Sequence, residues 1–154
     1  MNHESPENAP RMLARAKCDL GIARIGKISD DICYQGLITL CQQAIEKSLK
    51  SLLIHHDIKY PKIHSLSKLV EYIEKKKIVL PESIKISAGS TVELGCSFPS
   101  EFPMTFGPAV PLSEYAGKRR YSFSDEGEPD EQEYKNVLSQ AENVVNWVEQ
   151  QIQK

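Results

Sequence analysis

The sequence has no long apolar stretch, since its longest near-apolar run covers only positions 37–40. A membrane-spanning helix needs about 20 consecutive apolar residues, so none is predicted. The N-terminal stretch MNHESPENAPR has acidic side chains and prolines where a secretory signal peptide has a basic start and an apolar core. We therefore expect a soluble, cytoplasmic protein with no membrane contact.

The sequence also lacks a large excess of either charge, because it has 19 basic and 21 acidic residues and a formal net charge of −2. Any nucleic-acid contact would need a local basic patch. The cysteines are scattered and form no CxxC pair: Cys18, Cys33, Cys41 and Cys96. In a reducing compartment such residues are free thiols, so neither a disulfide nor a metal nor another cofactor is predicted.

Helical periodicity is present in four segments, whereas no segment alternates convincingly as a strand. The first helix is predicted to start after Asn8, with Pro10 in its first turn, and to end at Gly26. The Ser-Asp-Asp stretch at 29–31 is predicted to cap the second helix and to supply its first-turn acids.

The second helix has the strongest pattern, with apolar residues three and four apart along 34–54, so it is expected to lie at the centre. Pro61 separates it from a third helix over 66–77, and Pro81 opens a short fourth helix. The last helix is predicted to start at Asp130, with Glu133 completing a capping box. Trp147 flanks its stripe, at the core edge or at an interface.

Between the short helix and the last one, the stretch 95–111 is interrupted too often for a long helix, by Pro99, Pro103, Pro108 and Pro111. The sequence thus predicts a single all-α domain over 1–154. Its expected architecture is an antiparallel up-and-down bundle of four to five helices, with a long Pro-rich loop before the last helix.

The segment CQQAIEKSLKSLL at 41–53 resembles the central helix signature of HEPN domains, in which a glutamine pair precedes an alanine, a Glu-Lys and a further lysine. The resemblance continues through Pro61 to the His-Ser-Leu at 64–66. It resumes at Leu112, Tyr115, Arg120 and Tyr121, although Ser122 replaces the proline of the family. The stretch 14–23 also fits the first helix of the family, whereas 95–111 looks like an insertion.

The resemblance implies a helical bundle that usually works as a homodimer. The family includes metal-independent ribonucleases, often toxins of toxin–antitoxin pairs. It also includes non-catalytic members that bind nucleotides or partner a small nucleotidyltransferase. Catalytic members carry an arginine followed four to six residues later by a histidine on one helix. That spacing lets the histidine handle the proton of a ribose 2′-hydroxyl while the arginine neutralises the phosphate.

The Arg–His pair is missing from this sequence, whose histidines are His3, His55, His56 and His64. None of them follows an arginine at that spacing, which argues against ribonuclease activity. His55 and His56 end the second helix and are predicted to be surface residues or partners of the helix dipole. No carboxylate or cysteine falls nearby at metal-ligand spacing, so they are not predicted to bind a metal.

The best candidates for contact with a nucleotide or another anion are Lys47, Lys50, His64, Arg119, Arg120 and Tyr121. Each has a structural alternative. Lys50 stands four residues after Glu46, so the two can form a surface salt bridge. His64 can instead hold the start of the third helix. Arg120 can pair with a helix carboxylate while Tyr121 packs on the bundle rather than stacking on a base.

These observations favour a non-catalytic dimeric binding module for a nucleotide or RNA, or for a nucleotidyltransferase partner. The alternatives are a metal-independent ribonuclease with a non-standard Arg120, Tyr121 and His64 site, and a structural dimer whose grooves are empty. A homodimer is expected because the apolar stripes of the second and last helices exceed what a small bundle can cover.

Overall fold

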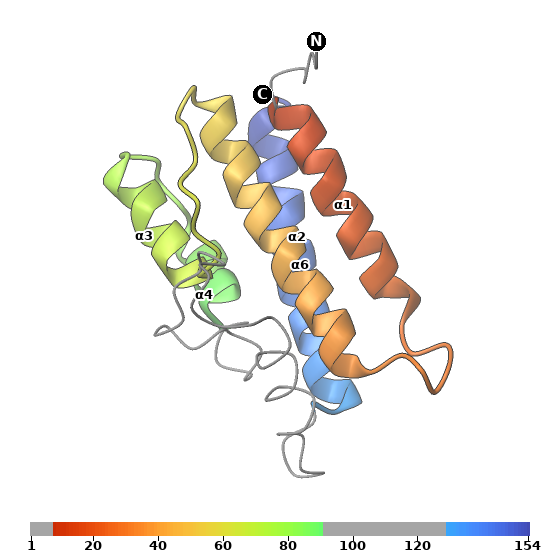
Figure 1. Ribbon diagram of the computed structural model, residues 1–154. Coiled ribbons are helices and arrows are strands. Elements are labelled where there is room, and N and C mark those ends of the chain that lie inside the picture. Colours follow the sequence, from red (N-terminus) through yellow and green to blue (C-terminus); the bar gives the residue numbers. More distant parts are fainter. Residues whose placement is uncertain (1–7, 91–128) are drawn as a thin grey trace, which may run out of the picture.

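The computed structural model describes residues 8–90 and 129–154. All regular structure within these two ranges is helical (Figure 1): α1 (Ala9–Ile25), α2 (Tyr34–His55), α3 (Leu66–Lys75), α4 (Glu82–Ser90) and α6 (Glu131–Ile152). The all-α bundle predicted from the periodicity is therefore confirmed. The Pro-rich stretch at 95–111 and the candidates at 119–121 lie outside the described residues.

Two of the helix starts form through the side chains that the sequence indicated. Asn8 Oδ1 accepts the backbone N–H of Arg11 at 2.9 Å and begins α1. At the start of α6, Asp130 Oδ1 accepts the N–H of Glu133 at 2.8 Å. Glu133 Oε2 accepts the N–H of Asp130 at 3.1 Å in return, which completes a capping box. Local chemistry thus fixes where the two outer helices begin.

The cap predicted for α2 at 29–31 is wrong. α2 begins at Tyr34, and Cys33 occupies its N-cap position without a side-chain hydrogen bond. The carbonyl of Ser29 accepts the N–H of Ile32 at 3.2 Å and closes a separate turn. A capping side chain must stand directly before the first helical turn to reach its N–H groups, and the stretch 29–31 stands too early for that.

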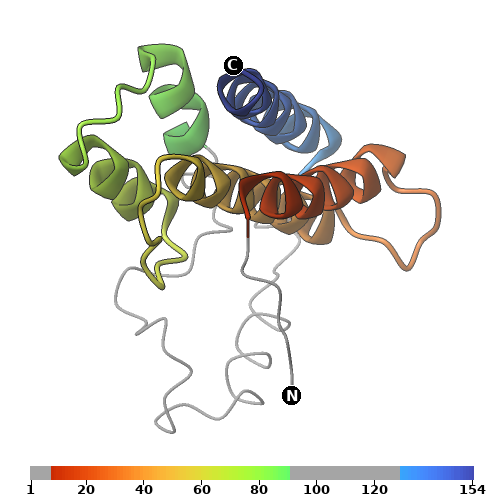
Figure 2. The ribbon, with the colours of Figure 1, turned by 90° about the horizontal axis from the view of Figure 1, so that it is seen from above.

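The helices do not alternate in direction throughout. α1 runs opposite to α2 and α6, whereas α2 and α6 run the same way (Figure 1). Their starts meet where the rings of Tyr34 and Tyr134 stack, with centroids 5.5 Å apart. Their ends meet where Leu52 and Trp147 line one hollow. Figure 2 shows α6 packed across α1 and α2, with α3 and α4 beside α2. The non-helical segment 56–65 carries the chain back along the bundle before α3 begins.

The core is built around α2, whose buried apolar side chains are Leu37, Ile38, Cys41, Ala44, Ile45, Leu49, Leu52 and Leu53. α6 contributes Tyr134, Val137, Ala141, Val144, Val145 and Val148. Burying each large side chain stabilises the fold by about 1.5–3 kcal/mol before conformational entropy is counted. Both stripes are therefore covered within one chain. No described helix is long and apolar enough to pass through a bilayer.

Candidate functional site

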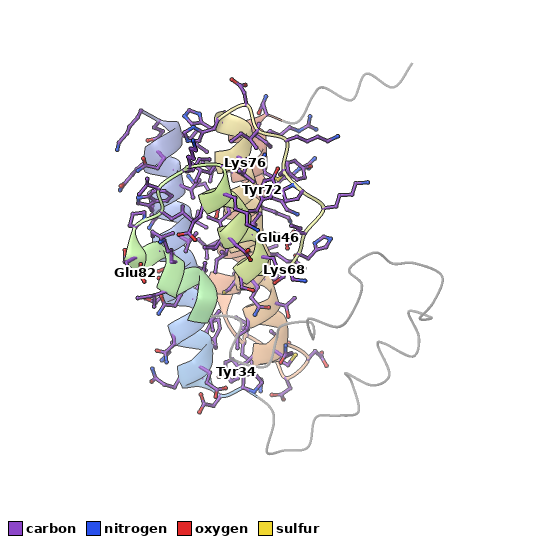
Figure 3. The ribbon with its side chains drawn as sticks, turned by 90° about the vertical axis from the view of Figure 1, so that its left-hand side faces the viewer. Tyr34, Glu46, Lys68, Tyr72, Lys76 and Glu82 are labelled. Carbon is purple, nitrogen blue, oxygen red and sulfur yellow. The ribbon has the colours of Figure 1, made fainter. Side chains whose placement is uncertain are left out.

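Glu46, on the central turns of α2, contacts two side chains, Lys50 and His64, through one oxygen. Its Oε1 accepts a hydrogen bond from Lys50 Nζ at 2.7 Å and lies 3.0 Å from His64 Nδ1. Figure 3 labels Glu46 midway along the bundle, well away from Tyr34 at one end. The carboxylate thus joins α2 to the segment that leads into α3, because His64 stands just before the Ser65 N-cap of that helix.

Lys50 is a buried ammonium group, since only 8% of its side chain is exposed. Besides the bond to Glu46, its Nζ lies 5.4 Å from the centroid of the Tyr60 ring. Burying a lysine without a counter-charge is costly, whereas a carboxylate and an aromatic face together offset that cost. Glu46 and Tyr60 therefore allow a charged lysine to sit inside the bundle.

His64 differs from Lys50 because 44% of its side chain is exposed. A carboxylate can only accept hydrogen bonds, so the contact with Glu46 requires a proton on Nδ1. In the neutral ring the remaining nitrogen, Nε2, then carries the lone pair. The geometry therefore holds His64 as the tautomer whose Nε2 can accept a proton.

Lys47 points to the other side of α2, where its Nζ donates to Asp19 Oδ2 of α1 at 2.6 Å. Its side chain is half-buried. The pair joins the first two helices as the Glu46–His64 contact joins α2 to the start of α3. Both lysines of the predicted site are thus matched by a carboxylate, and with Asp19 of α1 counted these groups carry no net positive charge.

Of the six sequence-predicted residues, Lys50 and His64 come together at Glu46, while Lys47 faces α1. Arg119, Arg120 and Tyr121 lie outside the described residues. The i,i+4 ion pair between Glu46 and Lys50 forms as the spacing predicts, but it is partly buried rather than on the open surface. Contact of these residues with an anion stays a prediction.

Sequence reasoning missed that Glu46 links Lys50 to His64 and that Tyr60 covers the lysine. Helical spacing could identify only the pair within α2, because His64 and Tyr60 come from the irregular segment that follows it. Nothing in that segment's composition indicates which side of α2 it lies against. The tyrosine directly before Pro61 was the one available signal, since a proline restricts its neighbour to extended backbone.

The other candidate chemistry is sparse in the described part of the chain. His55 and His56 meet edge to face with centroids 5.4 Å apart. No three His, Cys, Asp or Glu side chains gather there as metal ligands would. Cys18 and Cys33 are exposed free thiols, whereas Cys41 is buried. Burial and the nearby charge of Glu142 raise the pKa of Cys41 to about 12. Its thiol is therefore a core group rather than a nucleophile.

Comparisons with known proteins place this chain in a family. The sequence model of the HEPN domain matches residues 9–151. Among solved structures, the chain is similar to the crystal structure of ST0689, an archaeal HEPN homologue, with a TM-score of 0.61 and 23% sequence identity. That match covers 95% of this chain and 98% of the other, and it establishes a shared fold. No curated protein matches the sequence.

Proposed function

The chain belongs to the HEPN domain family, and from this premise we propose that it is a non-catalytic, dimeric module that binds a nucleotide or RNA. The alternative binding partner in keeping with the family is a small nucleotidyltransferase. The observation that carries the proposal is the missing Arg–His pair: none of the four histidines follows an arginine by four to six residues. Without both groups on one helical face, ribose and phosphate are not activated together.

The positive charge for binding has to come from outside the centre of α2. Lys47 is matched by Asp19 and Lys50 by Glu46. The densest basic stretch beside an aromatic in the sequence is Lys-Arg-Arg-Tyr at 118–121. We therefore assign phosphate contact to Arg120, with the neighbouring Tyr121 as a stacking surface for a base.

A labelled RNA oligonucleotide titrated with the protein tests this proposal by fluorescence anisotropy. Arg120→Ala should weaken binding roughly ten- to a hundredfold, because an arginine–phosphate hydrogen bond contributes about 1.5–3 kcal/mol. Arg24→Ala is the matched control: Arg24 of α1 is paired with Glu142 of α6, so its loss should leave affinity unchanged. A large fall in melting temperature with unchanged affinity would show that Arg120 is a structural ion-pair residue.

The sequence predicts a dimer contact through the apolar stripes of α2 and α6, but these stripes are buried within one chain. The dimer therefore needs a different surface. Exposed apolar side chains lie instead along the end of α1 and just beyond it: Ile22 is 52%, Ile25 58% and Ile28 72% exposed. Such a cluster is typical of a protein contact. We assign the dimer interface to this edge.

Sedimentation at micromolar concentration measures the assembly directly, against a chain mass of 17.4 kDa. The wild type should sediment as a dimer, and Ile25→Glu should give a monomer. Ile86→Glu on α4 is the control, because Ile86 is similarly exposed, at 59%, but lies away from α1. A monomeric wild type, or an Ile86→Glu variant that alone dissociates, contradicts the assignment.

A ribonuclease with a non-standard site is the second candidate, and one observation favours it. Glu46 orients His64 so that Nε2 can accept a proton, as a general base requires. Recovering the RNA after the binding assay separates the two candidates. A binding module leaves it intact, whereas an enzyme yields fragments whose formation His64→Gln abolishes.

A further inference from the structure

Two helices end side by side with the same backbone motif. At the end of α2, the N–H of Asp57 donates to the carbonyl of Ile54 and the N–H of Ile58 to that of Leu53, both at 2.9 Å. At the end of α3, the N–H of Lys77 donates to Glu74 at 2.9 Å and that of Ile78 to Ile73 at 3.4 Å. Both are Schellman motifs, in which the residue after the helix cap is left-handed.

The left-handed position belongs to a glycine in most such motifs, but here it holds Asp57, with φ 56°, and Lys77, with φ 63°. Aspartate tolerates this conformation better than most residues, whereas a lysine there is disfavoured by its Cβ. Lys77 therefore places a long cationic side chain at a position where a glycine would be less strained. This observation directs attention to what Lys77 borders.

A hollow of about 450 Å³ lies between the two motifs and the last turns of α6. Its lining includes His56, Lys76, Lys77, Val79, Trp147 and Gln151. Among the residues that the structure describes, no carboxylate belongs to this lining. Val79 is 86% exposed, so a large apolar side chain is left in water at the rim. The hollow therefore combines cations, an indole, an amide and uncovered apolar surface, which together suit a small ligand.

Neither lysine of this hollow has a counter-charge in the described residues, and Lys77 also has no aromatic partner there. Lys75, which does not line it, pairs with Glu71 at 2.8 Å. Lys76 lies with its Nζ 5.3 Å from the centroid of the Tyr72 ring. The side chain of Lys77 forms no ion pair or hydrogen bond within 8–90 and 129–154.

The competing account is that these lysines only offset the negative end of the α3 dipole. Lys75, in the last turn, already serves that purpose. A dipole partner also needs no strained backbone and no open hollow in front of it. The competing account predicts that loss of the Lys77 charge destabilises the fold and affects no ligand.

We propose that the hollow between the ends of α2, α3 and α6 binds a small aromatic anion, whose charged group meets Lys77 and whose ring lies against Trp147. The anionic group can be a phosphate, as in a nucleoside monophosphate, or a carboxylate on an aromatic ring. The lining does not include Glu46, and the proposal uses no residue of 118–121, so it does not rest on the function proposed above.

Trp147 reports on this site by itself, because it is the single tryptophan of the chain. The full-length protein is titrated with adenosine 5′-monophosphate, with benzoate and with uncharged adenosine, and indole fluorescence is followed. We expect a saturable change with at least one of the two anions and a much weaker one with adenosine. The arm that responds tells a phosphate source from a carboxylate source. No saturable change with either anion, or an equal response to adenosine, overturns the proposal.

Lys77→Gly removes the charge while keeping the left-handed backbone, so lost binding cannot be ascribed to unfolding. It should weaken binding of the responding anion roughly tenfold or more. Lys77→Asn, which also tolerates this backbone, should do the same. Two variants serve as controls. Asp57→Gly relieves the strain of a left-handed residue that does not line the hollow, and Lys75→Ala removes a charge two residues from Lys77. Both controls should bind like the wild type. Binding that survives Lys77→Gly, or that is lost equally in Lys75→Ala, contradicts the assignment.

Discussion

The two ends of the bundle close in different ways. Where α1 ends and α2 and α6 begin, Tyr134 donates a hydrogen bond of 2.5 Å to the carbonyl of Ala23. Its ring stacks on Tyr34, over which Lys27 Nζ lies 5.6 Å from the centroid. Gly26 turns the chain there with φ 79°. Polar atoms, rings and the turn thus all find partners within the chain.

The opposite end, where α2, α3 and α6 stop, remains open. Figure 3 labels Tyr34 at the closed end and Lys76 toward the open one. A lysine rather than a glycine takes the left-handed position after α3, and Val79 is left in solvent. Strain and exposed apolar surface that persist in a folded protein are found mostly at binding sites. The comparison indicates that contacts within the chain hold the first end together, although its exposed isoleucines are available to a second copy, whereas the open end leaves a hollow that a small ligand can fill.

Gly26→Ala should have the largest effect on stability. Gly26 has φ 79° and ψ −168°, a region essentially restricted to glycine. The substitution should lower the free energy of unfolding by about 2 kcal/mol, measured by urea denaturation. Gly21→Ala is the control, because Gly21 lies within α1 with no atom near its added Cβ. It should raise stability by about 0.5–1 kcal/mol. Equal effects of the two substitutions would show that the turn is not strained.

Alkaline pH should loosen the closed end next. Burial raises the pKa of Tyr134, and burial with the charge of Glu142 raises that of Cys41 from 9.0 to about 12. Both groups are neutral below pH 9, so the stability that they contribute is fully present there. As pH rises above 9, they ionise in the unfolded chain first, and stability falls. For Cys41 the slope approaches about 1.4 kcal/mol per pH unit at most.

Urea denaturation at a series of pH values from 8 to about 11 measures the free energy of unfolding across this decline. The range begins below the unfolded pKa of cysteine, 9.0, and ends below the folded pKa of Cys41, about 12. Cys41→Ala should flatten the decline above pH 9, since the buried thiol is then gone, although the smaller side chain lowers stability at every pH. Cys18→Ala, which removes an exposed thiol, should leave the slope unchanged. A slope that is the same in all three proteins would show that Cys41 does not titrate differently in the folded and unfolded states.

The closed end was largely predictable from the sequence because its signals are local. Gly26 and the Asp130–Glu133 box act on backbone groups within a few residues of themselves, as Asn8 does at the other end of α1, and each does what its position indicates. The failed cap at 29–31 is instructive, since its residue types are right but a separate turn intervenes before Tyr34. Local chemistry identifies a capping residue, and only the backbone path shows which helix it reaches.

The candidate site and the open end could be predicted only in part. Lys50 and Glu46 are linked by helical spacing, but the position of His64 on the same oxygen depends on how the segment 56–65 returns along α2. The hollow near Trp147 joins the ends of three helices that are distant in the sequence. Likewise, a positive φ at a lysine has no sequence signature. These features follow from tertiary packing, which periodicity does not encode.

Lys77→Gly should increase stability by about 1 kcal/mol, because glycine has no Cβ to oppose the left-handed backbone. Thermal unfolding should therefore show a higher melting temperature. The increase sharpens the comparison, since the position with positive φ at the closed end, Gly26, is already a glycine. Lys75→Ala is the control for loss of a charge from the α3 terminus and should not raise the melting temperature. A Lys77→Gly variant less stable than the wild type would favour the dipole account.

Asp57→Gly should give the smallest change, a stabilisation of a few tenths of a kcal/mol. Its φ of 56° is close to that of Lys77, at 63°, and both residues occupy the same place in a Schellman motif. Aspartate is strained less there because its short side chain can hydrogen-bond locally. Glycine also gains freedom in the unfolded chain, which offsets most of the benefit. Urea denaturation of both variants therefore measures how much more strain the lysine carries than the aspartate. If Asp57→Gly stabilised the protein as much as Lys77→Gly, the lysine would carry no extra strain, and the contrast between the two ends would lose one of its supports.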